Sequence, residues 1–125
     1  MTKLLIVDDS ETFRTRLKTE LNQNGYDIID AENGMMGLEM LEQNPDVSLI
    51  ITDINMPGYD GITMCEKIHE KENINRIPII ALTTQTSTEM KERGKAAGVV
   101  AWVLKPYSTE SLLKGIDAVL KKFGH

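Results

Sequence analysis

Residues 47–53 read Val-Ser-Leu-Ile-Ile-Thr-Asp, an apolar run that ends at a hydroxyl and a carboxylate. A continuous apolar run of this length predicts a strand that is covered on both faces. Strands of this kind occur in parallel sheets with helices packed on either side. The polar pair at the end of the run then lies where such sheets bind their ligands.

Similar runs and amphipathic stretches alternate along the rest of the chain. Predicted strands cover 4–7, 26–29, 47–51, 77–82 and 99–104, of which 26–29 is weak and edge-like. Predicted helices run over about 10–24, 34–44, 62–68, 86–97 and 108–123. The alternation of strand and helix predicts an α/β fold, in which a parallel sheet lies between two layers of helices.

Length and composition restrict the class of protein. The 125 residues fit one domain, and 14 basic against 19 acidic residues give a net charge of −5. An acidic domain is a poor match for nucleic acid, and no apolar run approaches the ~20 residues that span a membrane. The first residues lack the length of a signal peptide, and the single cysteine, Cys65, has no partner in the chain. We therefore expect a cytoplasmic protein that binds neither nucleic acid nor membrane.

Polar side chains follow four of the predicted strands, directly where each strand ends. The carboxyl ends of parallel strands meet at one edge of a sheet, so these side chains are expected to share one crevice. They comprise three carboxylates, a hydroxyl and an ammonium: Asp8, Asp9, Asp53, Thr83 and Lys105.

The chemistry of this set points to a metal ion and a phosphoryl group. Clustered carboxylates repel one another, and a hard divalent cation such as Mg²⁺ relieves that repulsion. No histidine or cysteine lies near these strand ends, which disfavours zinc and copper. Lys105 supplies a compact positive charge and Thr83 a hydrogen-bond donor for phosphoryl oxygens, while a carboxylate such as Asp53 can act as the nucleophile.

Each of these residues also has an ordinary interpretation when it is taken alone. Asp8 and Asp9 precede a helix and could simply cap it, and Thr83 could be a cap or a buried hydroxyl. Lys105 could be a solvated surface charge, and 53–57 could be a plain turn. The joint placement of complementary groups at four strand ends favours a functional site.

At these positions the chain resembles the receiver domains of bacterial response regulators, in particular the stand-alone CheY-like kind. The resemblance covers essentially the whole chain, and the matching stretches are 6–10, 53–61, 81–84 and 103–107. It implies one receiver domain over 1–125. It also implies a doubly wound five-stranded parallel sheet in the order 2-1-3-4-5, flanked by five helices.

The resemblance also implies a role for each acidic residue of the crevice. Asp53 would be the phospho-acceptor and a ligand of Mg²⁺. Asp9 would bind the metal directly, and Asp8 would act mostly through a bound water. The backbone carbonyl of Asn55 would be a further metal ligand.

Other residues would bind the phosphoryl group and transmit its arrival. Thr83 would donate a hydrogen bond to it, Lys105 would pair with it, and the Lys105–Pro106 peptide would be cis. Trp102 stands where the family usually has a smaller aromatic residue. Two hypotheses remain for it, a ring that swings between outward and inward positions and a packed or partner-facing indole that does not. Asn55 and Gln85 occupy positions where the family tunes the rate of dephosphorylation.

The predicted function is a phosphorylation-dependent signalling switch. It would receive its phosphoryl group from a histidine kinase, or from a small donor, and hydrolyse it slowly. It would act as a monomer on a downstream target through the face of the fourth helix, last strand and last helix. We expect a chemotaxis-type regulator, and the alternative is a phosphorelay intermediate that passes phosphate to a histidine phosphotransfer partner.

Two other protein classes fit the sequence less well. A metal-dependent phosphatase with an aspartyl intermediate would need a second acid two residues after Asp53, where this chain has Asn55. A flavodoxin-like flavin carrier would need a phosphate-binding loop after the first strand, where Asp8 and Asp9 would repel the phosphate.

Overall fold

The computed structural model describes residues 2–56 and 60–123. Residues 57–59, which include Pro57 and Gly58 of the predicted loop, lie outside the described residues. The strands are β1 (Lys3–Val7), β2 (Asp27–Ala31), β3 (Leu49–Thr52), β4 (Ile79–Thr83) and β5 (Val99–Leu104). The helices are α1 (Glu11–Gln23), α2 (Gly34–Gln43), α3 (Gly61–His69), α4 (Thr88–Ala96) and α5 (Thr109–Phe123). Within the described ranges no helix is long and apolar enough to cross a lipid bilayer.

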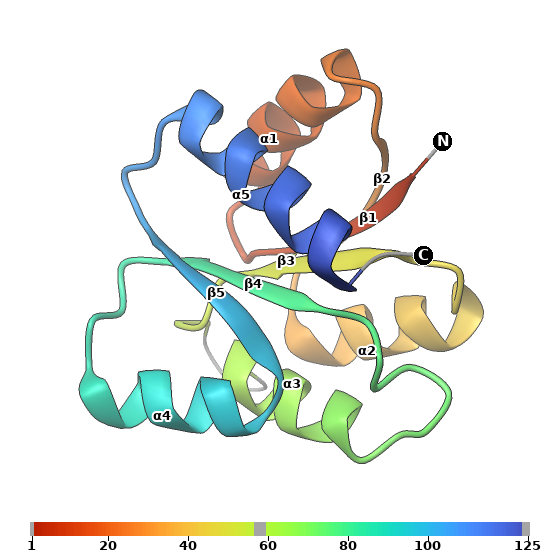
Figure 1. Cartoon of the computed structure of the whole chain (residues 1–125), viewed down its shortest axis with the longest axis vertical. Coiled ribbons are helices and arrows are strands. Elements are labelled where there is room, and N and C mark those ends of the chain that lie inside the picture. Colours follow the sequence, from red (N-terminus) through yellow and green to blue (C-terminus); the bar gives the residue numbers. More distant parts are fainter. Residues whose placement is uncertain (1, 57–59, 124–125) are drawn as a thin grey trace.

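The strands form one parallel sheet in the order β2-β1-β3-β4-β5, which confirms the predicted fold. Helices α1 and α5 cover one face of the sheet, and α2, α3 and α4 cover the other (Figure 1). Strand β2 lies at an edge of the sheet, as its weaker apolar pattern predicted.

Two apolar clusters fill the spaces between the sheet and its two layers of helices. The central strand β3 contributes to both, since Ile50 belongs to the cluster under α2, α3 and α4, while Leu49 and Ile51 belong to the cluster under α1 and α5. All three side chains are fully buried. Each such burial stabilises the fold by about 1.5–3 kcal/mol, which explains why the run is continuously apolar.

The strand register brings the polar strand ends to one level. Val7 of β1 pairs with Thr52 of β3, and Thr83 of β4 pairs with Leu104 of β5. The residues that follow these pairs therefore emerge at the same edge of the sheet.

Several element boundaries differ from the predicted ones by about two residues. Strand β4 begins at Ile79 instead of residue 77, because Pro78 has no N–H and the N–H of Ile77 is used in a turn with Ile74. Helix α4 begins at Thr88 instead of residue 86, because the Ser87 hydroxyl accepts the Met90 N–H at 3.2 Å and caps the helix there.

Gly61, the first residue of α3, lies directly against the backbone of Asp53. A Cβ atom on Gly61 would be 1.9 Å from the carbonyl oxygen of Asp53, well inside van der Waals contact. The Asp60 side chain caps α3 by accepting the Thr63 N–H at 2.9 Å, so the start of the helix is fixed in place. Only glycine allows α3 to approach the Asp53 loop this closely.

We expect Gly61→Ala to lower the free energy of unfolding by about 1–3 kcal/mol or more, because the added methyl group must displace backbone. Gly115→Ala is the matched control, since a Cβ there meets nothing within 4 Å in α5. That control should raise the free energy of unfolding by about 0.5–1 kcal/mol through helix propensity. Urea denaturation followed by circular dichroism measures both, and equal effects at the two glycines would refute the close-approach explanation.

Candidate functional site

Three carboxylates lie together beyond the carboxyl ends of β1 and β3. Oxygen atoms of Asp8, Asp9 and Asp53 all lie within 4.8 Å of one another. Asp8 is buried, Asp53 is partly buried and Asp9 is exposed. The Asp53 N–H donates to the carbonyl of Val7 at 2.9 Å, which ties the end of β3 to the end of β1. The Asp8 carboxylate accepts the Ser10 N–H at 2.9 Å, which holds it at the start of α1.

The ammonium of Lys105 joins two of these carboxylates. Its Nζ lies 2.8 Å from Asp8 Oδ2 and 3.2 Å from Asp53 Oδ2. Burial would lower the pKa of Lys105, but the hydrogen bonds and negative charges of Asp8 and Asp53 outweigh that effect and raise its pKa above the ordinary value. Lys105 is therefore charged at neutral pH and offsets part of the carboxylate repulsion. The Lys105–Pro106 peptide bond is cis, as predicted.

The donor set fits a hard divalent cation. All three side chains offer carboxylate oxygens, and Mg²⁺ binds through one or two carboxylates while keeping several waters and phosphate oxygens. The exposed Asp9 leaves the cluster open to solvent on one side, where waters or a phosphoryl group could complete the coordination. Asp8, Asp9 and Asp53 could therefore hold Mg²⁺.

Gln85, in the loop after β4, connects the remaining predicted site residues. Its N–H donates to the Thr83 hydroxyl at 3.2 Å, and its side-chain amide donates to Asn55 Oδ1 at 3.0 Å. Its side-chain oxygen accepts the Ser87 N–H at 2.9 Å, and its backbone carbonyl accepts the indole N–H of Trp102 at 2.8 Å. Among the described residues no hydrogen bond joins Thr83 to the three carboxylates. Gln85 therefore connects Thr83 to the loop that carries Asp53 and Asn55.

Trp102 is half-buried and packs against α4. A Cβ atom on Gly94 would lie 3.0 Å from the ring carbon Cζ3, so the indole occupies the space that this glycine leaves open. With its N–H bonded to Gln85, the ring is fixed at both ends. The structure thus records a packed indole, and its swing stays a prediction.

Two residues hold the backbone of Asp53 and Asp8 in place, and sequence reasoning assigned this role to neither of them. The Thr52 hydroxyl donates to the carbonyl of Asp53 at 2.8 Å. The guanidinium of Arg14 donates to the carbonyl of Asp8 at 2.7 Å and to Asp30 Oδ2 at 3.0 Å. A signal for Arg14 was present, because it precedes the buried Leu17 by three residues and so falls on the buried face of α1.

An aromatic pair supports Lys105 from the side of α1. The Lys105 Nζ lies 4.1 Å from the centroid of the Phe13 ring, and Phe13 meets the Tyr107 ring edge-on with centroids 6.0 Å apart. The Tyr107 hydroxyl donates to Glu20 Oε1 at 2.8 Å, and the Thr109 hydroxyl donates to the other oxygen of the same carboxylate. Phe13 also packs against the apolar cluster that contains Leu17 of α1, and no role at the site was predicted for it.

Residues 4–117 match the family described as the response regulator receiver domain. The chain belongs to this family. The receiver domain is 36% identical over 119 residues to chemotaxis protein CheY1 of Helicobacter pylori, covering 94% of this chain and 96% of that protein. It is 37% identical over 121 residues to protein PilH of Pseudomonas aeruginosa, covering 96% and 98% of the two chains. The crystallised chemotaxis protein CheY4 of Vibrio cholerae has the same fold, with a TM-score of 0.90 and 36% identity over 96% of this chain and 99% of that one.

In this receiver domain, burial and the hydrogen bond to Glu20 raise the pKa of Tyr107 from 10.0 to about 12. Because the folded protein favours the neutral phenol, the stabilisation by Tyr107 is fully present below pH 10.0 and is lost as the pH rises toward 12. We expect the parent to be more stable than Tyr107→Phe at pH 8, with a difference that shrinks between pH 10 and 12. Urea denaturation across this range measures it, and a constant difference would contradict the assignment.

Proposed function

We propose that this receiver domain is a phosphorylation-dependent switch of a two-component system. It takes a phosphoryl group on Asp53 from a histidine kinase, with Mg²⁺ as cofactor. The observation that carries the proposal is the Lys105 ammonium, which is shared between Asp53 and the buried Asp8 beside the open carboxylate of Asp9. The similarity to chemotaxis proteins of Helicobacter pylori and Campylobacter jejuni supports a chemotaxis-type regulator. We propose that it acts as a monomer in the cytoplasm.

The proposed chemistry assigns a role to each group around Asp53. An Asp53 carboxylate oxygen attacks the phosphorus of a phosphohistidine, the phosphorus–nitrogen bond breaks, and the neutral imidazole leaves with a proton from solvent. Lys105 balances the charge of the transferred phosphoryl oxygens, as it balances the carboxylates beforehand. Held by Asp8, Asp9, Asp53 and the carbonyl of Asn55, Mg²⁺ would supply further positive charge at those oxygens.

The proposed switch runs from Thr83 through Gln85 to Trp102. A phosphoryl group adds roughly −1.5 to −2 charges, which attracts the buried Thr83 hydroxyl as a donor. The Thr83 oxygen now accepts the Gln85 N–H, so its movement disturbs the residue that also bonds Trp102 and Ser87. Phosphorylation thereby biases the start of α4 and the middle of β5 toward a second arrangement, as a population shift.

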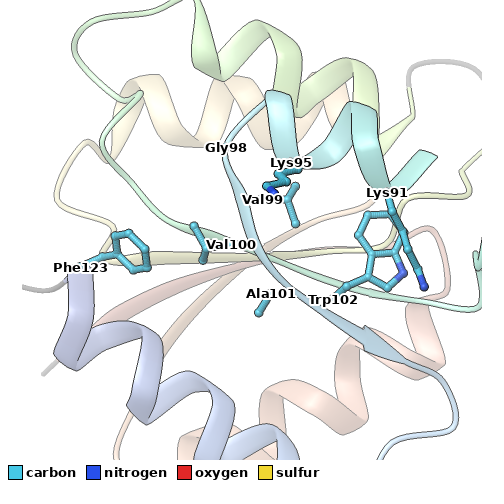
Figure 2. A pocket seen from close by; sticks show the side chains of 8 residues that line it. All are labelled: Lys91, Lys95, Gly98, Val99, Val100, Ala101, Trp102 and Phe123. Atoms are coloured by element: carbon cyan, nitrogen blue, oxygen red, sulfur yellow. The ribbon is translucent and has the colours of Figure 1, made fainter. Parts of the chain in front are cut away.

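The proposed output face lies between α4, β5 and the end of α5. A groove of about 450 Å³ there is lined by Lys91 and Lys95 of α4, Trp102 and Val100 of β5, and Phe123 of α5. Figure 2 shows Trp102 with Lys91 at one end of the groove and Phe123 at the other. The two lysines and the apolar floor suit a target segment that carries both acidic and apolar side chains. Trp102 connects this groove to the phosphorylation site.

Intact mass spectrometry after incubation with acetyl phosphate tests the proposal. We expect a gain of one phosphoryl group that requires Mg²⁺ and that is lost in Asp53→Asn. Asp27→Asn is the matched control, because Asp27 is an exposed aspartate at the opposite, amino-terminal edge of the sheet. The control should gain the group at the parental rate.

If Asp53→Asn still gains a phosphoryl group, the phospho-acceptor is another residue. No gain in the parent from acetyl phosphate or from a phosphorylated histidine kinase, under conditions where it binds Mg²⁺, would refute phosphoryl transfer as its function.

A further inference from the structure

The Phe13 ring lies beside the Lys105 ammonium of the proposed phosphorylation site. We propose that Phe13 is a positioning residue that holds the Lys105 ammonium against Asp53 through a cation–π interaction. This inference rests on the proposed function, because it concerns the residue that would balance the charge of the phosphoryl group.

The Lys105 ammonium lies close to two sources of negative potential, the face of the Phe13 ring and the carboxylates of Asp8 and Asp53. Nζ lies 4.1 Å from the ring centroid of Phe13, well within the ~6 Å over which a ring face attracts a cation. The same atom lies 2.8 Å from Asp8 Oδ2 and 3.2 Å from Asp53 Oδ2. The side chain of Lys105 is only 19% exposed, so water screens the attraction to the ring less than it would at the surface.

The ring itself is oriented by a chain of contacts that runs from α1 to α5. Tyr107 meets Phe13 edge-on at an interplanar angle of 76°. The hydroxyl of Tyr107 is bonded to Glu20 of α1, and the same carboxylate accepts a hydrogen bond from Thr109 at the start of α5.

The Phe13 ring limits the positions that the Lys105 ammonium can take. A lysine ammonium has a flexible stem, and its position costs side-chain entropy to define. With the ring face 4.1 Å away and two carboxylates in hydrogen-bond contact, the ammonium stays beside Asp53 when a donor enters the site. The role of Phe13 is therefore positional, and none of its atoms takes part in the transfer.

The test separates the electronic effect of the ring from its shape. Mono-, di- and trifluorophenylalanine, introduced at position 13 alone, remove the negative potential of the ring face in steps while keeping its size. Phe13→Leu removes the ring, and Phe13→Trp keeps an aromatic face. Tyr26, replaced by phenylalanine and by the same fluorinated phenylalanines, is the matched control, because it directly precedes β2 at the amino-terminal edge of the sheet, opposite the edge where Lys105 lies.

We expect the rate of phosphorylation from acetyl phosphate to fall stepwise with fluorination at position 13, by roughly three- to tenfold across the series and in Phe13→Leu. Phe13→Trp should retain most of the rate, and the series at Tyr26 should show no trend. The dissociation constant of Mg²⁺ should stay within about twofold, because the proposed ligands are carboxylates and Phe13 is not one of them.

A second measurement does not depend on phosphorylation. The ring current of Phe13 should shift the εCH₂ proton resonance of Lys105 upfield in the unphosphorylated protein, and Phe13→Leu should abolish that shift. An unshifted resonance would refute the inference. So would a flat fluorination series, or a loss of Mg²⁺ affinity equal to the loss of rate. A parent that is not phosphorylated at all would refute the proposed function, while the resonance would still decide the position of Lys105.

Discussion

The ion pairs of Lys105 with Asp8 and Asp53 are the interaction on which the site depends. Asp8 is only 2% exposed, and a buried carboxylate without a partner would cost several kcal/mol. The parallel register places the ends of β1, β3 and β5 close enough for one ammonium to serve two carboxylates. The remaining negative charge faces solvent at Asp9, where a divalent cation or a phosphoryl group with its cation can be accommodated.

The backbone of Asp53 is held in place as firmly as its side chain. Its carbonyl accepts the Thr52 hydroxyl and lies where any side chain on Gly61 would have to be, while its N–H is bonded to Val7. The carboxylate is therefore presented from a loop with little freedom. Under the proposed function, the rigid backbone of Asp53 and the hydrogen bonds of Gln85 would act together, because charge added at a fixed carboxylate would move Thr83 and, through Gln85, Trp102.

Much of the fold and the composition of the crevice could be predicted from the sequence, because both follow from where apolar runs end. Asp8, Thr83 and Lys105 each come directly after a predicted strand, and Asp53 comes two residues after one. The long-range contacts of Arg14 with Asp30, of Phe13 with Lys105 and of Gln85 with Asn55 could not be predicted, because they join elements distant in the chain. They depend on how helices and loops pack on the sheet. The start of α4 was misplaced by two residues because residues 83–87 are all polar and do not mark a boundary, whereas the helix begins only after the Ser87 cap.

The most direct test of the account is a Mg²⁺ titration followed by the backbone amide resonances of the ¹⁵N-labelled protein. The account predicts saturable shifts concentrated at residues 8–10, 53–55 and 105, with smaller shifts at Thr83 and Gln85. Asp9→Asn should weaken binding roughly tenfold or more, since even the outer-shell partners of a metal site typically contribute 10–100-fold. Saturable shifts centred elsewhere, or no shift at these strand ends, would contradict the claim that the carboxyl ends of β1, β3 and β5 form one cation-binding site.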